Sequence, residues 1–90
     1  MKRFELTLHG QVQGVGYRVA AVRKATAIGV TGTVWNESDG SVVVVAEGLP
    51  RKLETFLLWA ESGPPAARVT LRELTWTSAT GQYDSFGVRA

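Results

Sequence analysis

Cysteine is absent from this chain of 90 residues, and histidine occurs only once. The absence of cysteine excludes disulfide bonds, thiolate metal sites and a cysteine nucleophile. No apolar run approaches the length needed to cross a membrane, and residues 1–5 lack the apolar core of a secretory signal. We therefore expect a cytoplasmic protein that does not bind a membrane.

Neither positive nor negative charge is in strong excess. Ten basic and eight acidic residues leave a net charge of +2, which is too small to argue for a nucleic-acid partner. A hydrophobic fraction of 44% and a charged fraction of 20% are typical of folded globular proteins. The length leaves room for one domain, which we assign to residues 1–90.

Hydrophobic periodicity predicts the order strand, helix, strand, strand, helix, strand, followed by a short extra strand. The expected strands cover residues 4–8, 30–36, 41–47, 69–77 and 86–88, and the expected helices cover residues 18–28 and 49–62. This order is typical of an α+β sandwich of the ferredoxin-like βαββαβ class. We therefore expect a mostly antiparallel sheet with both helices on one face.

Two of these strands carry further signals. Four consecutive valines in residues 42–45 predict a central strand that is buried on both faces. In residues 69–77 the apolar positions change parity between Leu71 and Leu74. A β-bulge near Arg72–Glu73 would account for this change.

Glycines gather between the first strand and the first helix, at positions 10, 14 and 16. Glycine allows positive φ and a close approach of the backbone to a ligand, and successive N–H groups beside a helix N-terminus favour phosphate. The P-loop and dinucleotide fingerprints are not met, because no Gly-Lys pair occurs and Val19 replaces the third glycine. From the glycine spacing alone, a phosphate site and a glycine-rich turn without a ligand are equally favoured.

Arg18 changes that balance, because it lies at the start of the predicted helix. A positive charge there opposes the helix dipole by about 0.3–1 kcal/mol. The planar guanidinium also matches phosphate oxygens. The sequence therefore favours an anion site.

His9 and Asn36 are the other candidates for a functional site. A single histidine without a partner more often has a structural or solvent-facing role than a catalytic one. Asparagine at the end of a strand commonly forms a turn. In a split βαβ sheet, however, Asn36 can lie close enough to the first loop to reach a ligand held by Arg18. RNA binding is disfavoured, because residues 41–47 carry no aromatic side chain for stacking.

Around these residues the sequence resembles the acylphosphatase family. The family pattern aliphatic-x-Gly-x-Val-Gln-Gly-Val-x-aromatic-Arg is met by residues 8–18. A second pattern, Gly-aromatic-Val-x-Asn-x3-Gly-x-Val-x5-Gly, runs over residues 32–48, with Thr33 at its aromatic position. Two long motifs in the expected order and spacing make this resemblance far more specific than a glycine-rich loop.

The resemblance implies a metal- and cofactor-independent enzyme that hydrolyses small-molecule acyl phosphates to a carboxylate and inorganic phosphate, and we expect it to be a monomer. It implies that Arg18 clamps the phosphate and that Asn36 orients the attacking water. The implied phosphate-binding loop comprises Gln13, Gly14, Val15, Gly16, Tyr17 and Arg18. The chemistry is consistent with these groups, because a carboxylate leaving group requires no general acid and phosphoryl transfer depends chiefly on positioning and charge stabilisation.

Three departures from the family pattern stand out. Tyr17 replaces the usual phenylalanine, Thr33 replaces an aromatic residue, and Trp35 replaces a polar or basic one. The last two adjoin Asn36 and are expected to affect substrate access or rate rather than the fold. One alternative is a non-catalytic anion-binding or regulatory module of the same fold. Another is an accessory domain of a larger maturation protein, which a chain that starts at Met1 makes less favoured.

Overall fold

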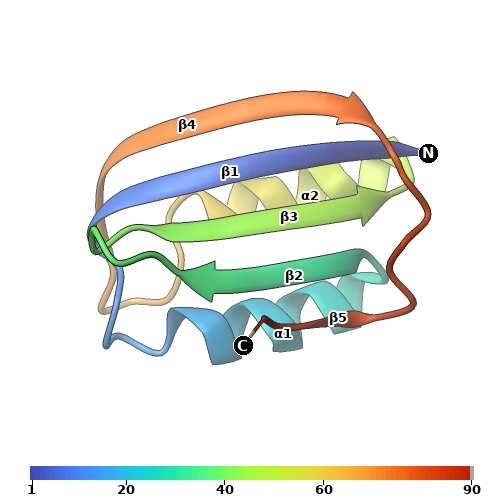
Figure 1. Ribbon diagram of the computed structural model, residues 1–90. Coiled ribbons are helices and arrows are strands. Elements are labelled where there is room, and N and C mark those ends of the chain that lie inside the picture. The colour runs from blue at the N-terminus through green and yellow to red at the C-terminus, as the bar shows by residue number, and fades with distance from the viewer. Residues whose placement is uncertain (90) are drawn as a thin grey trace.

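The computed structural model describes residues 1–89 and confirms the predicted order of elements (Figure 1). The strands are β1 (Lys2–Gln11), β2 (Thr31–Asn36), β3 (Val42–Gly48), β4 (Arg68–Ser78) and β5 (Phe86–Val88), and the helices are α1 (Tyr17–Ile28) and α2 (Pro50–Ala60). The sheet order is β4-β1-β3-β2-β5. All neighbouring strands are antiparallel except β2 and β5, and both helices cover one face (Figure 1). The ferredoxin-like α+β prediction is confirmed.

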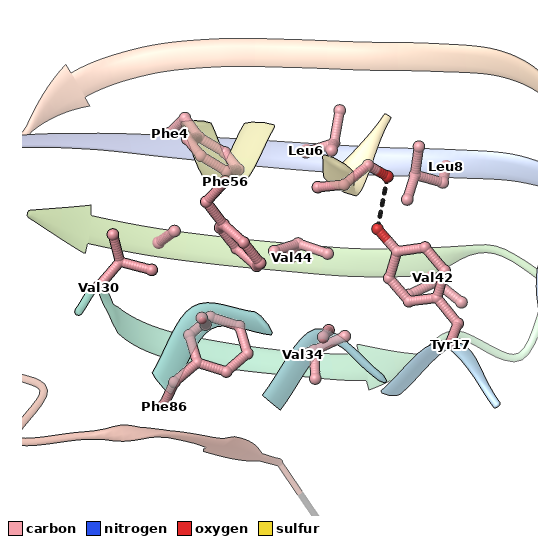
Figure 2. Packing of buried hydrophobic residues seen from close by; sticks show 14 of the residues in the cluster. Phe4, Leu6, Leu8, Tyr17, Val30, Val34, Val42, Val44, Phe56 and Phe86 are labelled. Carbon is pink, nitrogen blue, oxygen red and sulfur yellow. Dashed lines mark hydrogen bonds between the residues drawn. The ribbon is translucent and has the colours of Figure 1, made fainter. Parts of the chain in front are cut away.

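The strand β3 occupies the middle of the sheet, as its valines predicted. Its side chains Val42 and Val44 are fully buried beneath the helices, and Val45 and Glu47 are buried on the opposite face. Aromatic contacts complete the core on the helix side, where Phe56 of α2 packs on residues of β1 and β5 (Figure 2). The short terminal strand is thereby held to the core by packing as well as by pairing with β2.

The β-bulge of β4 lies at Thr70, so the expected position near Arg72–Glu73 is wrong. Pairing with β1 runs without a break as far as Leu71 and resumes at Val69, which leaves Thr70 without a partner. Val69 consequently packs against the core, whereas Leu71 is exposed on the other face. The periodicity misplaced the bulge because it treated Val69 and Leu71 as members of one face.

Two glycines allow strands to approach closely. Gly10 has φ 120°, and a Cβ atom there would lie 2.1 Å from the carbonyl oxygen of Arg68. Gly32 has φ 144°, and a Cβ atom would lie 1.9 Å from the carbonyl oxygen of Val45. The first glycine of each sequence motif is therefore required by backbone packing within the sheet.

Neither α1 nor α2 combines the length and hydropathy of a helix that could span a membrane.

Candidate active site

The loop that joins β1 to α1 lies at the same end of the sheet as the last residue of β2 (Figure 1). A pocket of about 90 Å³ opens at this place. Its lining residues are Val12, Gln13, Gly14, Gly16, Tyr17, Arg18, Val19 and Asn36. The structure thus brings together the predicted site residues except Val15, which packs against the core.

Backbone donors are concentrated along this pocket. Gly14 and Gly16 have φ of 73° and 79°, and no heavy atom lies within 4 Å of a Cβ built on either. The helix α1 begins after Gly16 without a side-chain cap, and its first backbone hydrogen bond runs from Ala20 N–H to Gly16 O. The N–H groups of residues 17–19 precede that bond and therefore have no helical acceptor. Together with the helix dipole they favour an anion.

Tyr17 anchors the end of the loop to α2. Its side chain is 2% exposed, and its hydroxyl donates a 2.6 Å hydrogen bond to the carbonyl oxygen of Ala60 (Figure 2). Its ring packs on Trp59 and lies so close to Gly63 that a Cβ there would be 2.6 Å away. Burial raises the pKa of the Tyr17 phenol well above its usual value. Tyr17 therefore offers the site a backbone N–H, because its neutral side chain is occupied elsewhere.

Gln13 holds the other end of the loop. Its amide nitrogen donates to the carbonyl oxygen of Glu37 at 2.8 Å and to that of Ser41 at 2.9 Å. These residues belong to the turn between β2 and β3. Both side-chain N–H donors of Gln13 are therefore committed to the protein, and only its backbone N–H remains to donate to an anion.

Asn36 ends β2 on the helix side of the sheet. It pairs with Val42, whose side chain is buried beneath the helices, and it lines the pocket. The neighbouring residues Thr33 and Trp35 lie on the opposite face, because side chains alternate along a strand. Neither lines the pocket, so their expected effect on substrate access is not supported by a direct contact.

Trp35 instead takes part in a cluster on the opposite face. The guanidinium carbon of Arg89 lies 3.9 Å from the centroid of its ring, and its indole N–H donates to the carboxylate of Glu37. This arrangement connects the C-terminal end of the described chain to the strand that carries Asn36.

His9 lies outside the pocket. Its Nε2 atom is 2.6 Å from a carboxylate oxygen of Glu73 on β4, which supports the structural role that the sequence favoured. Within residues 1–89 no group of three or more His, Asp or Glu side chains is placed to hold a metal ion. A larger depression of about 530 Å³ borders β2, β5 and the loop between β4 and β5, but neither Arg18 nor Asn36 reaches it.

A sequence model of the acylphosphatase family matches residues 4–88. The chain belongs to the acylphosphatase family. It is 44% identical over 88 residues to an acylphosphatase from Methylococcus capsulatus, covering 98% of this chain and 96% of that one. It is 49% identical over 86 residues to an acylphosphatase from Cupriavidus necator, covering 96% and 91% of the two chains. The crystal structure of the acylphosphatase from Bacillus subtilis is similar over the whole of both chains, with a TM-score of 0.94 and 29% identity.

Membership of the acylphosphatase family makes the chain a hydrolase, with a small-molecule acyl phosphate as substrate and phosphate as product. The non-catalytic module of the same fold is not favoured by these relatives. The sequence predicted six of the eight residues that line the pocket and did not predict Val12 or Val19. It also missed what two of the side chains do. Gln13 and Tyr17 were assigned only to the loop, and their hydrogen-bond partners lie 24 to 43 residues further along the chain, where no local pattern connects them.

Proposed function

We propose that this acylphosphatase binds the phosphoryl group of its substrate in the pocket at the N-terminal end of α1 and hydrolyses the carboxyl–phosphate bond without a metal ion. The observation that carries this proposal is the shared lining of one pocket by the glycine-rich loop, Arg18 and Asn36. We assign phosphate binding to Gln13, Gly14, Val15, Gly16, Tyr17 and Arg18, through backbone N–H groups and the guanidinium.

Binding in this site rests on charge. The N–H groups of residues 14–19 and the positive end of α1 present donors to the phosphoryl oxygens, and the guanidinium of Arg18 adds a planar pair of donors. The donors at the start of α1 are held in place before the substrate arrives, because the hydroxyl of Tyr17 is hydrogen-bonded to Ala60 of α2. Fixed donors stabilise the charge that develops in the transition state at little cost in reorganisation.

Asn36 is proposed to orient the water that attacks phosphorus in line with the leaving carboxylate. The new bond forms between the water oxygen and phosphorus, and the bond between phosphorus and the acyl oxygen breaks with its electron pair. The carboxylate departs as a stable anion, so no acid has to protonate it. The water proton passes to an oxygen of the transferred phosphoryl group, which yields inorganic phosphate.

The proposal is tested with benzoyl phosphate as substrate and with the metal ions removed by a chelator. We expect undiminished release of benzoate and phosphate after chelation. Turnover that disappears on chelation and returns with a divalent cation would overturn the metal-independent mechanism. Absent turnover, with phosphate still raising the temperature of unfolding, would favour the non-catalytic module.

We also propose that the enzyme acts as a monomer in the cytoplasm. The pocket is lined by residues of a single chain, which supports a site that needs no second copy. Light scattering at working concentration tests the oligomeric state.

A further inference from the structure

The side chain of Gln13 joins the two halves of the candidate site. Both hydrogen bonds of its Nε2 atom run to the turn that follows β2, one to Glu37 O and one to Ser41 O. Glu37 is the residue directly after Asn36. The amide has two N–H donors, and both are used here.

The turn that receives these bonds is itself well closed. Glu37 N–H donates to Ser41 O at 2.9 Å, and Gly40 N–H donates to Glu37 O at 3.2 Å. The carboxylate of Asp39 accepts from both the N–H and the hydroxyl of Ser41, and these bonds lower the pKa of Asp39. These hydrogen bonds hold the turn in one arrangement. Because the turn directly follows Asn36, the hydrogen bonds from Gln13 to the turn also constrain the position of Asn36.

Gln13 is the sole side chain that makes this connection in the described part of the chain. Among residues 1–89, no other side-chain hydrogen bond joins residues 12–18 to residues 36–41. The regular pairing of β1 with β3 ends at Leu8 and Val42, before the loop begins. Without Gln13, the loop and the turn would be held in register only through the sheet and the core.

We propose that Gln13 is a positioning residue that sets the place of Asn36 relative to the phosphate-binding loop. This inference rests on the proposed function, because it assigns to Gln13 the alignment of the water-orienting amide with the bound phosphoryl group. A misplacement of about 1 Å can cost on the order of 10²-fold in rate while leaving the binding groups intact. The loss of Gln13 should therefore lower kcat far more than it weakens phosphate binding.

The test replaces Gln13 by methionine, which has a similar length and lacks the amide donors. We expect Gln13→Met to lower kcat by about 10- to 100-fold and to change the dissociation constant of inorganic phosphate by less than about threefold. Gln11→Met is the matched control, since Gln11 is exposed and lies outside the pocket. Gln13→Glu keeps the shape but turns an acceptor toward two carbonyl oxygens, and it should lower kcat likewise if the methionine variant fails to fold.

A double-mutant cycle with Asn36→Ala separates positioning from a general structural role. If Gln13 acts through Asn36, Gln13→Met lowers kcat in the native background and has little further effect once Asn36 is alanine. An equal loss in both backgrounds would overturn the proposal. A phosphate affinity that falls as steeply as kcat would overturn it too.

A second readout does not depend on turnover. Asn36 is the only asparagine of the chain, so its side-chain amide gives the one asparagine NMR signal pair, beside the pairs of the three glutamines. We expect phosphate to shift this pair in the native protein and to shift it much less in Gln13→Met, while the backbone signals of Gly14 and Gly16 respond in both. An unchanged Asn36 response in the variant would overturn the positioning role. Failure of the native protein to hydrolyse benzoyl phosphate would instead overturn the proposed function.

Discussion

Polar groups gather at both ends of β3, and the two ends use them differently. At the end remote from the pocket, Glu47 is 3% exposed and its carboxylate accepts hydrogen bonds from Arg3, from the N–H and hydroxyl of Thr80, and from the N–H of Gly81. At the pocket end, the first N–H groups of α1 have no helical acceptor and border open space. One end satisfies its polar groups within the protein, and the other leaves backbone donors without a protein acceptor.

The pKa of Glu47 shows how this difference works. Burial alone raises the pKa of this carboxyl, but the hydrogen bonds from Thr80, Arg3 and Gly81 outweigh it and bring the pKa down to about 2. The negative charge therefore contributes to stability and fixes the loop after β4 against the sheet. At the pocket, the corresponding negative charge has to come with a ligand, so a bound anion is expected to stabilise this end.

The substitution with the largest expected effect is Arg18→Ala, which removes the guanidinium from the lining of the pocket. We expect kcat/KM to fall by about 10³-fold or more, because a cation that stabilises a phosphoryl transition state contributes on this scale. Phosphate should no longer raise the temperature of unfolding. Arg23→Ala is the matched control, since Arg23 is exposed further along α1. Equal phosphate protection in both variants would remove Arg18 from the binding site.

Asn36→Ala sharpens the comparison, because it separates chemistry from binding. We expect kcat to fall by about 10²–10³-fold while phosphate still protects against thermal unfolding. Gln82→Ala, which removes an exposed amide outside the pocket, should leave both properties unchanged. If Asn36→Ala lost phosphate binding as completely as Arg18→Ala, Asn36 would hold the loop together instead of orienting water.

The remote end is tested by Glu47→Gln, followed by unfolding measured as a function of pH. The folded pKa of about 2 lies below the ordinary value of 4.5 for a glutamate carboxyl. The stabilising contribution is therefore present above pH 4.5 and is lost as the pH falls toward 2. At pH 7 the substitution should lower the free energy of unfolding by roughly 2 kcal/mol and flatten its decline between these pH values.

Glu5→Gln is the control for that experiment, since Glu5 also contacts Arg3 but is exposed. It should change stability by less than about 1 kcal/mol. Neither variant should alter kcat, because both residues lie outside the pocket. A Glu47→Gln protein with the native pH profile would show that its paired carboxylate does not stabilise this end.

The sequence sufficed for the fold because local and long-range signals agreed. In β1 the apolar residues Phe4, Leu6 and Leu8 alternate with polar ones, which is the pattern of a half-buried strand, and the structure buries all three. The valines predicted the middle strand, and the strand lies there. The bulge at Thr70 was misplaced because its position depends on pairing with β1, which periodicity within β4 does not report.

Most residues that line the candidate site were predictable, but the contacts that hold them in place were not. The two motifs contain Arg18 and Asn36, and the fold brings the start of α1 and the end of β2 to one pocket. The supporting bonds of Gln13 and Tyr17 end on backbone carbonyl oxygens. Every residue carries such an oxygen, so the identity of the acceptor residue does not reveal the hydrogen bond.

The smallest expected effect concerns the conformation of the loop itself. Gly16 has φ 79° at the start of α1, and a Cβ built there meets no heavy atom within 4 Å. Gly16→Ala should therefore cost only the left-handed conformation of an L-residue, about 1–2 kcal/mol, and should still fold. Gly87→Ala is the control, since that site is equally open but lacks a positive φ, and it should be neutral or slightly stabilising. Equal unfolding temperatures for the two variants would show that an L-residue adopts the left-handed turn at the pocket end without strain.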